Sequence, residues 1–434
     1  MRKWIYAPLI LMSYASYSAH ANSPYNAINE SIDDSVVEAG DVLAIGIPAV
    51  GYFASWLHDD FEGATQLTLS ALATQGIVEI TKNTVGRFRP NSDLAGASYK
   101  SFPSGHSAGA FSGAAFLQTR YGSYWGIPAY AGATFVAASR VHGRRHYADD
   151  VLAGAGIAIL VNQFIVSPYS SEGVSTSIYP NDEGGLSVDV SIPLGAFDYD
   201  QNRAKGNGQL KAANRHRFEL NIGFNMTDSL GEAGARDVLP DSQLVDDHQP
   251  FSFINYQYLL DTRSILEVEL SPNETRRYGT VAGTLDVGGI SYQDGDELYL
   301  AFKQWSIGSS YYHQYPLNDR LVLAAGLGLY AYWVELESDY LTGGRYAQEE
   351  GVEILPSLTG KLGYRLAGNL SATGMARYQL MAGNYVTQLE AGFIYRFNSD
   401  WEMGLKYGYS KSKWSNTNIK YDTDSIILNI ANRF

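Results

Sequence analysis

The chain has 434 residues, which is enough for two or three domains, and it combines 44 glycines and 32 tyrosines with a net charge of −14. It contains no cysteine, so disulfide bonds and metal sites built from thiolates are excluded. The negative charge argues against nucleic acid as a partner, because binding to the phosphate backbone depends on an excess of Lys and Arg.

The first residues have the pattern of an export signal. Two cationic residues in MRKW precede the short apolar stretch IYAPLILM, and SAHA at 18–21 places small residues where a signal peptidase cleaves. We therefore expect a signal peptide over 1–21 and a mature chain that begins near Asn22.

A region rich in Ala, Gly and Leu follows, up to about residue 168. Apolar residues recur there at intervals of three and four, which is typical of helices. The pattern predicts five helices, near 41–58, 64–83, 104–121, 126–141 and 148–164. The best apolar run, 151–161, is shorter than the roughly 20 residues that a membrane span needs. We interpret residues 22–168 as a soluble helical bundle, and membrane-spanning helices are the alternative.

The stretch 169–214 is polar and rich in Ser, Asn and Gly, which predicts a linker. One isolated strand is expected within it, at LSVDVSIPL.

From residue 215 to the end, apolar and polar residues alternate. Ile426, Leu428 and Ile430 share one face of the last segment, and Asn429 and Arg433 share the other. A soluble β-sandwich also alternates, but strands of ten residues or more, with aromatic residues at their ends, are typical of a transmembrane barrel. We expect ten strands, near 216–226, 251–260, 264–271, 296–313, 321–336, 352–366, 369–381, 386–397, 401–413 and 422–434. Twelve strands are the alternative, if 185–194 or 279–292 contributes.

The connections between these strands alternate in length. LDTR and LNDR are short, whereas 227–250 and 337–353 are long and acidic, as in outer-membrane barrels with short periplasmic turns and long external loops. The terminal IANRF resembles the C-terminal signal of such barrels. An even strand number leaves both barrel ends on the periplasmic side, so we expect an outer-membrane protein whose helical domain lies in the periplasm. A small barrel fills its interior with side chains, so a pore is not expected.

Three short pieces of the helical region carry chemistry. The first is KNTVGRFRP, with Lys82 and Arg89; the second is PSGH, with Ser104 and Gly105; the third is SRVHGRRHYADD. Each piece alone is explained by a solvated helix end, a capped helix start or a surface ion pair. Together they provide what phosphoryl transfer needs, and no HExxH motif or other metal cluster accompanies them.

The cations and the helix start suit a phosphate group. Lys82, Arg89 and Arg140 supply positive charge for the non-bridging oxygens. Ser104 and Gly105 begin a helix whose free N–H groups attract an anion, and Gly105 allows a close approach.

Two histidines complete the predicted site. His146 is a candidate nucleophile that attacks phosphorus directly, and Asp150, four residues further on, is placed to orient it. His106 is the candidate acid that protonates the leaving oxygen and later activates water. Asp149 has the wrong spacing to be the partner of His146.

The three pieces together resemble the signature of the type 2 phosphatidic acid phosphatase superfamily, which includes bacterial class A acid phosphatases, lipid phosphatases and vanadium haloperoxidases. The resemblance covers the first third of the chain. It implies a helical bundle, a phosphohistidine at His146, and phosphatase action without a metal or other cofactor.

The sequence therefore predicts an α + β multidomain protein with an all-α bundle over 22–168 and an antiparallel barrel over 215–434. The expected function is a metal-independent phosphomonoesterase that acts on lipid phosphates or small phosphate esters. A vanadate-dependent haloperoxidase is one alternative. A non-enzymatic channel or adhesin with a vestigial helical domain is the other.

Overall fold

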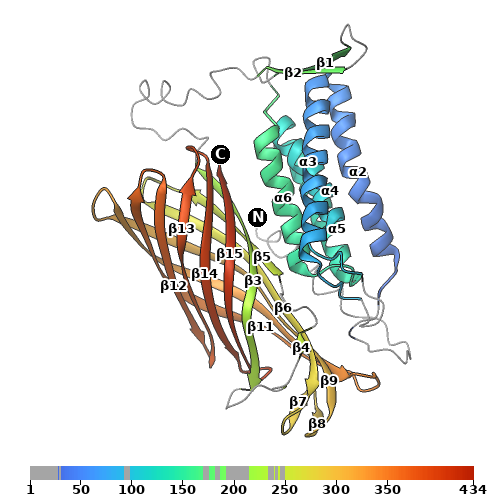
Figure 1. Ribbon diagram of the computed structural model, residues 1–434, viewed down its shortest axis with the longest axis vertical. Coiled ribbons are helices and arrows are strands. Elements are labelled where there is room, and N and C mark those ends of the chain that lie inside the picture. The colour runs from blue at the N-terminus through green and yellow to red at the C-terminus, as the bar shows by residue number, and fades with distance from the viewer. Residues whose placement is uncertain are drawn as a thin grey trace.

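The computed structural model describes residue 28, residues 31–91, 98–169, 215–232, 239, 243–244 and 250–434, and the backbone of 175–180 and 186–191. The expected signal peptide and most of the expected linker lie outside these residues. A helical bundle stands beside a β-barrel, with the two in contact along one side (Figure 1).

The five expected helices are all present. They are α2 (Ser35–Leu57), α3 (Phe61–Val85), α4 (Gly105–Tyr121), α5 (Ser123–His142) and α6 (Ala148–Ile165). Side-chain caps define the starts of α2, α3 and α4; for example, the Asp60 carboxylate accepts the Gly63 N–H at 2.8 Å, and the Ser104 hydroxyl accepts the Ser107 N–H at 3.4 Å. Successive helices run in opposite directions, so the start of α2, the end of α3 and the start of α4 meet at one end of the bundle (Figure 1).

Small residues allow the helices to pack closely. A Cβ atom at Gly113 of α4 would lie 2.6 Å from the Pro48 nitrogen of α2, and one at Gly154 of α6 would overlap the Ser104 carbonyl. The second contact presses the start of α4 against α6. The Ser104 N–H accordingly donates to the Asp150 carbonyl at 2.9 Å. Two of the three chemical pieces of the sequence are thus joined through their backbones.

The second half of the chain is a closed antiparallel barrel of ten strands, as expected. The strands pair in the order β6-β5-β3-β15-β14-β13-β12-β11-β10-β9, and β9 pairs back with β6. They are β3 (His216–Glu232), β5 (Pro250–Leu259), β6 (Ser264–Thr280), β9 (Glu297–Pro316), β10 (Leu321–Tyr340), β11 (Ala347–Ala367), β12 (Leu370–Met381), β13 (Asn384–Arg396), β14 (Trp401–Trp414) and β15 (Ile419–Arg433).

The remaining strands lie outside the ten-stranded ring. β4 (Gln243–Leu244) pairs with β6, and β7 (Leu285–Val287) forms a hairpin with β8 (Ile290–Tyr292). β2 (Leu186–Ser191) is not isolated, because it pairs with β1 (Ser175–Pro180). Neither 185–194 nor 279–292 adds a strand to the ring, so the alternative of twelve strands is wrong.

The barrel has one end with short turns and one with longer connections. The turns 260–263, 317–320, 368–369 and 397–400 lie at the short-turn end, together with the C-terminus. The opposite end carries 281–296, 341–346 and the chain between β3 and β5, together with the short turns 382–383 and 415–418, and we call it the long-connection end. This is the asymmetry that the sequence predicts.

Side chains fill the barrel interior. Lys406 Nζ lies 3.1 Å from Glu219 Oε1, and Arg377 Nη1 lies 2.9 Å from Glu269 Oε1. Toward the long-connection end the interior becomes apolar, with Phe302 and Trp414 in one large cluster. The paired charges and this cluster support the expectation of a filled barrel.

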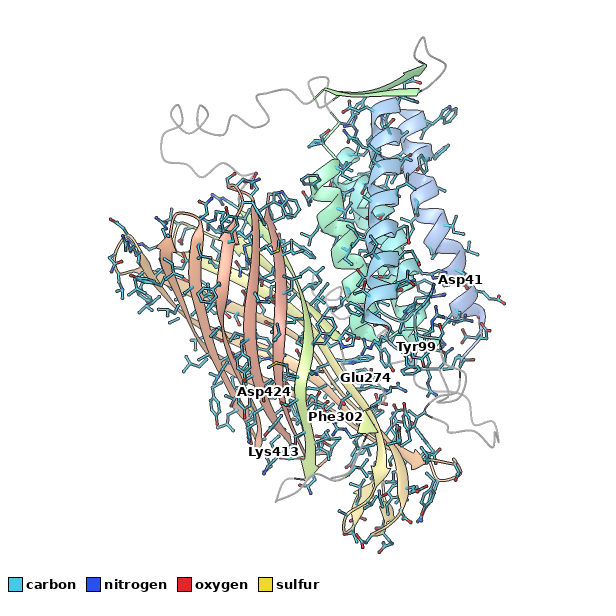
Figure 2. The ribbon with its side chains drawn as sticks, viewed as in Figure 1. Asp41, Tyr99, Glu274, Phe302, Lys413 and Asp424 are labelled. Carbon is cyan, nitrogen blue, oxygen red and sulfur yellow. The ribbon has the colours of Figure 1, made fainter. Side chains whose placement is uncertain are left out.

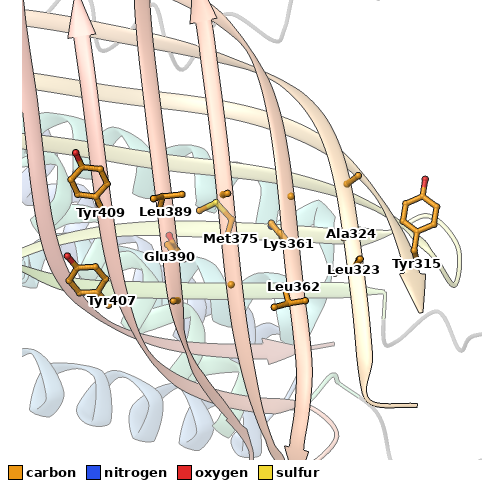
Figure 3. A pocket seen from close by; sticks show the side chains of 15 residues that line it. Tyr315, Leu323, Ala324, Lys361, Leu362, Met375, Leu389, Glu390, Tyr407 and Tyr409 are labelled. Atoms are coloured by element: carbon orange, nitrogen blue, oxygen red, sulfur yellow. The ribbon is translucent and has the colours of Figure 1, made fainter. Parts of the chain in front are cut away.

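The outer wall of the barrel is largely apolar. Leu327, Leu329 and Ile354 are among its exposed side chains. A shallow depression crosses strands β9–β14 where small residues such as Gly374 replace larger ones (Figure 3). The charged residues at its edge belong to the interior, since Lys361 Nζ binds Glu267 Oε2 at 2.8 Å. The depression lies far from the chemical motifs of the sequence.

Helix α6 packs against this outer wall. Ile157 and Leu160 of α6 form an apolar cluster with Phe218 and Leu220 of β3. Phe218 and Leu220 alternate with Arg217 and Glu219, which pair inside the barrel, so they belong to the outward face. The bundle therefore lies alongside the barrel wall, a contact that the sequence did not predict.

The surface of the bundle also differs from that expected of a soluble domain. Helices α2 and α6 are long and apolar enough to cross a membrane by length and composition. Only 28% of the apolar window of α2 is buried within the protein, against 67% for α6. From the sequence, these helices were judged by uninterrupted apolar runs such as 151–161. Their apolar character was missed because small and hydroxyl residues interrupt the runs without adding charge.

Candidate active site

All eight predicted site residues lie at one end of the helical bundle. Lys82 is at the end of α3 and Ser104 caps α4; Arg140 is near the end of α5. His146 precedes α6 and Asp150 lies in its first turn. Because the helices alternate in direction, these distant parts of the sequence meet at the same end.

His146 is buried and held in one tautomer. Its Nδ1 lies 2.8 Å from the Ser101 carbonyl oxygen, which can only accept a hydrogen bond, so Nδ1 carries the proton. Asp150 Oδ2 is further from Nδ1, at 3.5 Å. The other ring nitrogen, Nε2, is therefore left with its lone pair, as a nucleophile requires. The carbonyl fixes the tautomer, and the carboxylate adds a negative charge beside the ring.

Asp150 is itself anchored by several donors. Arg87 Nη1 lies 2.8 Å from Asp150 Oδ1 and 2.8 Å from Asp149 Oδ1. The Tyr147 N–H donates to Asp150 Oδ2 at 2.9 Å, and the Ser101 hydroxyl binds the same oxygen. Burial acts to raise the pKa of Asp150, but Arg87, His146 and Ser101 outweigh burial and lower it. Asp150 is thus kept ionised beside His146.

Asp149 plays a different part, as its spacing suggested. Its carboxylate accepts the Asp150 N–H at 3.1 Å and the Arg87 guanidinium, and it does not contact His146. Burial raises the pKa of Asp149. One arginine therefore binds two adjacent carboxyl groups, and Asp150 is the one whose pKa is lowered.

The start of α4 and the Lys82 side chain lie side by side. A Cβ atom at Gly105 would be 3.1 Å from Lys82 Nζ. The amide N–H groups of Gly105 and His106 have no hydrogen-bond partner in the part of the chain that the structure describes. The nearest carboxylate to Lys82 is Glu79, at 3.6 Å. An ammonium group and free helix N–H groups therefore converge on one place, which suits an anion.

Arg89 adds a second positive charge. Its Nε is buried and has no hydrogen-bond partner among the described residues. Burial lowers the pKa of Arg89, and the nearby Arg145 and Arg140 act in the same direction. Burial also lowers the pKa of Lys82, and the positive charge of Arg89 lowers it further. Glu79 and Asp150 oppose these effects but do not reverse them, so the pKa of each cation stays lowered. Cations that repel one another in this way create a site for a bound anion.

Arg140 and His106 share a carboxylate that the sequence did not indicate. Asp41 of α2 binds the Arg140 Nη1 atom, and its Oδ1 lies 3.2 Å from His106 Nε2. Burial and Arg140 lower the pKa of His106, whereas Asp41 raises it. Burial also lowers the pKa of His146, against the effect of Asp150.

Three contributors were therefore missed by sequence analysis: Arg87, Ser101 and Asp41. Arg87 lies in the same GRFRP stretch as Arg89, so its presence was visible but its partners were not. Ser101 acts mainly through a backbone carbonyl, which no sequence motif reports. Asp41 lies 99 residues before Arg140 and only the fold brings them together.

The loop between α5 and α6 is fixed by the start of α2. His142 Nε2 lies 2.8 Å from Asp34 Oδ2, and Arg145 Nη2 lies 2.7 Å from Asp33 Oδ1. These pairs hold the chain just before His146. In the ranges that the structure describes, no group of three or more His, Asp or Glu side chains could hold a metal ion.

The barrel also contacts the site. The Ser252 hydroxyl of β5 donates to the Asp149 carbonyl at 2.7 Å. Arg276 of β6 donates to the Pro90 carbonyl at 3.4 Å, and its guanidinium lies 5.3 Å from the centre of the Tyr147 ring. Glu274 lies beside the bundle in Figure 2, close to the end that carries Asp41 and Tyr99.

Comparison with known proteins agrees with this geometry. Residues 63–170 match the family model described as the PAP2 superfamily. The chain therefore contains a PAP2 superfamily domain, joined to a ten-stranded barrel. The match includes α3 to α6 and leaves α2, with Asp41, outside it.

Two curated relatives share sequence with the helical domain. One is the lipid A 1-phosphatase of Porphyromonas gingivalis, with 40% identity over 91 residues, or 20% of each chain. The other is the lipid A 4'-phosphatase of Helicobacter pylori, with 32% identity over 128 residues, or 28% of this chain and 64% of the relative. In both cases the match spans less than two thirds of the relative.

Solved structures resemble the two halves separately. Aquifex aeolicus LpxE matches 36% of this chain and 92% of its own, with 20% identity and a TM-score of 0.28. The outer membrane protease OmpT from Escherichia coli matches 53% of this chain and all of its own, with 9% identity and a TM-score of 0.35.

Proposed function

We propose that the protein is an outer-membrane phosphatase that removes phosphate from lipid phosphate monoesters through a phosphohistidine at His146. The observation that carries this proposal is the hydrogen bond from His146 Nδ1 to the Ser101 carbonyl. It leaves Nε2 unprotonated in a cluster of cations. The PAP2 domain and the two relatives named as lipid A phosphatases support the same activity.

The first half of the reaction forms the covalent intermediate. His146 Nε2 attacks phosphorus, the bond from phosphorus to the ester oxygen breaks, and protonated His106 gives its proton to that oxygen. The imidazole of His146 becomes positively charged. Asp150, kept ionised by Arg87, stabilises this charge.

The second half releases phosphate. Neutral His106 takes a proton from a water molecule, whose oxygen attacks phosphorus, and the bond from phosphorus to Nε2 breaks. Inorganic phosphate leaves and His146 returns to its neutral form. Both steps pass through a state in which charge spreads over the non-bridging oxygens, and Lys82, Arg89, Arg140 and the start of α4 are the groups that stabilise it.

The substrate is proposed to be a lipid because the catalytic domain lies against a barrel wall that is apolar on its outside. The closed barrel with this wall also supports a place in the outer membrane. The sequence suggested a catalytic domain in the periplasm. Packing of α6 on the outer wall favours a different position, at the depth of the barrel itself.

The alternatives from the sequence have less support. No observation in the described residues favours a haloperoxidase over a phosphatase. The paired charges and the apolar cluster inside the barrel argue against a channel.

The proposal is tested by phosphate release from phosphatidic acid in detergent and from p-nitrophenyl phosphate, with a chelator present. We expect the wild type to release phosphate and the His146→Gln variant to show none above background. The wild type should also form a phosphoprotein that is stable in alkali and lost in acid, as a phosphorus–nitrogen bond requires.

Equal rates for wild type and the His146→Gln variant would remove His146 as the nucleophile. No release by folded wild type from either ester would overturn the phosphatase proposal. Folding is checked independently by the shift in electrophoretic migration that closed barrels show on heating.

A further inference from the structure

We propose that the helical bundle lies within the membrane beside the barrel, and that its active site faces toward the long-connection end, onto lipid phosphates of the external leaflet. The identity of the substrate in this inference rests on the proposed phosphatase function. The placement of the bundle rests on the packing of α6 against the barrel wall. Four observations lead to it.

The first observation is the direction of α6 along the barrel wall. At the start of α6, the Asp149 carbonyl accepts the hydrogen bond from Ser252 of β5, which pairs with Ile222 in the middle of β3. At the end of α6, the Phe164 ring lies 6.0 Å from that of Trp401, which follows the turn 397–400. The start of α6, where His146 and Asp150 lie, therefore points toward the long-connection end.

The second observation is the length of the helix segments without charge. No Asp, Glu, Lys or Arg occurs in 42–57 of α2, 63–78 of α3, 123–139 of α5 or 151–165 of α6. At about 1.5 Å per residue these segments span roughly 22–26 Å. The apolar band of outer-membrane barrels is about 25 Å tall. The bundle thus carries an apolar zone of the same height as the barrel that it contacts.

The third observation is that much of the surface of α2 and α3 is not covered by protein. Ile45 and Trp56 of α2 are 77% and 71% exposed, and Leu72 of α3 is 66% exposed. The outer wall of the barrel is also apolar, and α6 packs between the bundle and this wall. A surface of this size is unfavourable in water, and lipid chains are the occupant that covers both parts alike.

The fourth observation is that both ends of the bundle are polar. The far end has the buried pair of Arg120 and Asp60, at 2.7 Å, with Tyr121 and Tyr169 around it. The opposite end has the cations and histidines of the active site. Apolar middles with polar, aromatic ends are typical of membrane-embedded helices.

The apolar outer wall of the barrel ends at the level of the site. Beyond Pro272, toward the long-connection end, Glu274 and Arg276 of β6 point outward from the barrel. Arg276 Nε lies 2.9 Å from Glu274 Oε1. On the neighbouring strands Lys303 binds Glu337 at 2.7 Å. These residues lie level with the catalytic loops, where Arg276 contacts Pro90. The active site therefore opens where lipid headgroups begin.

The long-connection end is the external one by the ordinary architecture of outer-membrane barrels, in which short turns and both barrel termini face the periplasm. The occupant of the site is then a lipid whose phosphate lies at the external boundary. A phosphate ester in the periplasm would meet only the Arg120 end of the bundle.

The placement can be tested by cysteine labelling, because the chain has no cysteine of its own. Tyr99→Cys reports on the active-site end (Figure 2), Ser123→Cys on the opposite end and Leu72→Cys on the apolar middle. Thr342→Cys and Asp319→Cys are matched barrel controls, in a long connection and a short turn. Intact cells are treated with a maleimide that does not cross the outer membrane.

We expect labelling of the Tyr99→Cys and Thr342→Cys proteins in intact cells. The Ser123→Cys and Asp319→Cys proteins should react only after the outer membrane is permeabilised, and the Leu72→Cys protein only after denaturation. Labelling of Ser123→Cys but not Tyr99→Cys in intact cells would overturn the external placement. Labelling of Leu72→Cys in native membranes would overturn the membrane-embedded bundle.

A second measurement addresses the substrate leaflet. The protein is reconstituted in phosphatidylcholine vesicles with phosphatidic acid in the outer leaflet alone, and the Thr342→Cys label gives the fraction of molecules with the long connections outward. The amount of phosphatidic acid hydrolysed should be proportional to the fraction of molecules with the long connections outward. An amount proportional to the fraction with the long connections inward would overturn the inference. The same protein assayed in detergent shows separately whether the phosphatase function itself fails.

Discussion

Both halves of the molecule bury charged side chains, but they treat them in opposite ways. Inside the barrel, Arg377 faces Glu269 and Lys406 faces Glu219, so each charge is neutralised within the protein. At the end of the helical bundle, Lys82 and Arg89 lie close enough to lower the pKa of Lys82, and the carboxylate beside Lys82 is the exposed Glu79, at 3.6 Å. The first arrangement holds a structure together, whereas the second is complete only when an anion enters. Four substitutions sharpen this contrast.

Arg89→Met has the largest expected effect. Loss of one donor to the transition-state oxygens lowers kcat/KM by about 10²–10³, while the stability of the fold stays the same or rises because cation repulsion is relieved. Steady-state kinetics with phosphatidic acid and urea unfolding give the two values. Arg263→Met, the same change in a short barrel turn, is the control and should alter neither. A destabilised Arg89→Met protein with unchanged kcat/KM would break the contrast.

Arg377→Met should give the reverse result. It leaves Glu269 buried without its cation and costs about 3–5 kcal/mol of unfolding free energy. The rate per folded molecule should not change. The exposed pair of Lys411 and Asp422 provides the control, since Lys411→Met should cost less than about 1 kcal/mol in the same urea titration. Loss of activity in the folded Arg377→Met protein would contradict the division between the halves.

Asp41→Asn should move the pH profile. Asp41 raises the pKa of His106 against burial and Arg140, so its removal lowers this pKa further. His106 must be protonated to serve as the acid, and activity is lost as pH rises through its pKa. The alkaline limb of kcat should therefore move to lower pH, with a several-fold loss at neutral pH. An unchanged limb, or one at higher pH, would show that Asp41 does not act through His106.

Ser252→Ala should have the smallest effect. It removes one hydrogen bond between the barrel and the start of α6, worth about 1 kcal/mol. We expect a few-fold fall in kcat with little change in KM, because Asp149 adjoins Asp150. Ser310→Ala, inside the barrel beside Tyr330, is the matched change and should leave kcat unaltered. Equal kinetics for both variants would mean that the barrel does not position the site.

Much of the fold follows from sequence periodicity. Ten strands and five helices were predicted because alternation and three-to-four spacing each report which face is buried. Strand β6 shows where the rule fails, since it was expected over 264–271 and extends to Thr280. Its outward Glu274 and Arg276 break the lipid-facing pattern, because they face the catalytic domain rather than lipid.

The site was predictable where its residues lie in local motifs. Lys82, His106 and His146 stand in such motifs, and the structure brings them to one end of the bundle. Asp41 and the Ser101 carbonyl act across the fold, and no spacing in the sequence measures that distance. The side-by-side packing of bundle and barrel was likewise invisible, because outward apolar residues read the same whether they contact lipid or a helix.

The contact between Ser252 and Asp149 has a consequence for substrate choice. It fixes the height of the catalytic histidine relative to the barrel, at the position where the outer wall changes from apolar to charged. Ile28 adds a second attachment nearby, buried against Tyr299 and Ala301 of β9. In the membrane placement that we propose, an active site held at a constant height would reach phosphates close to the hydrocarbon. Phosphates carried further out on a long headgroup would lie beyond its reach.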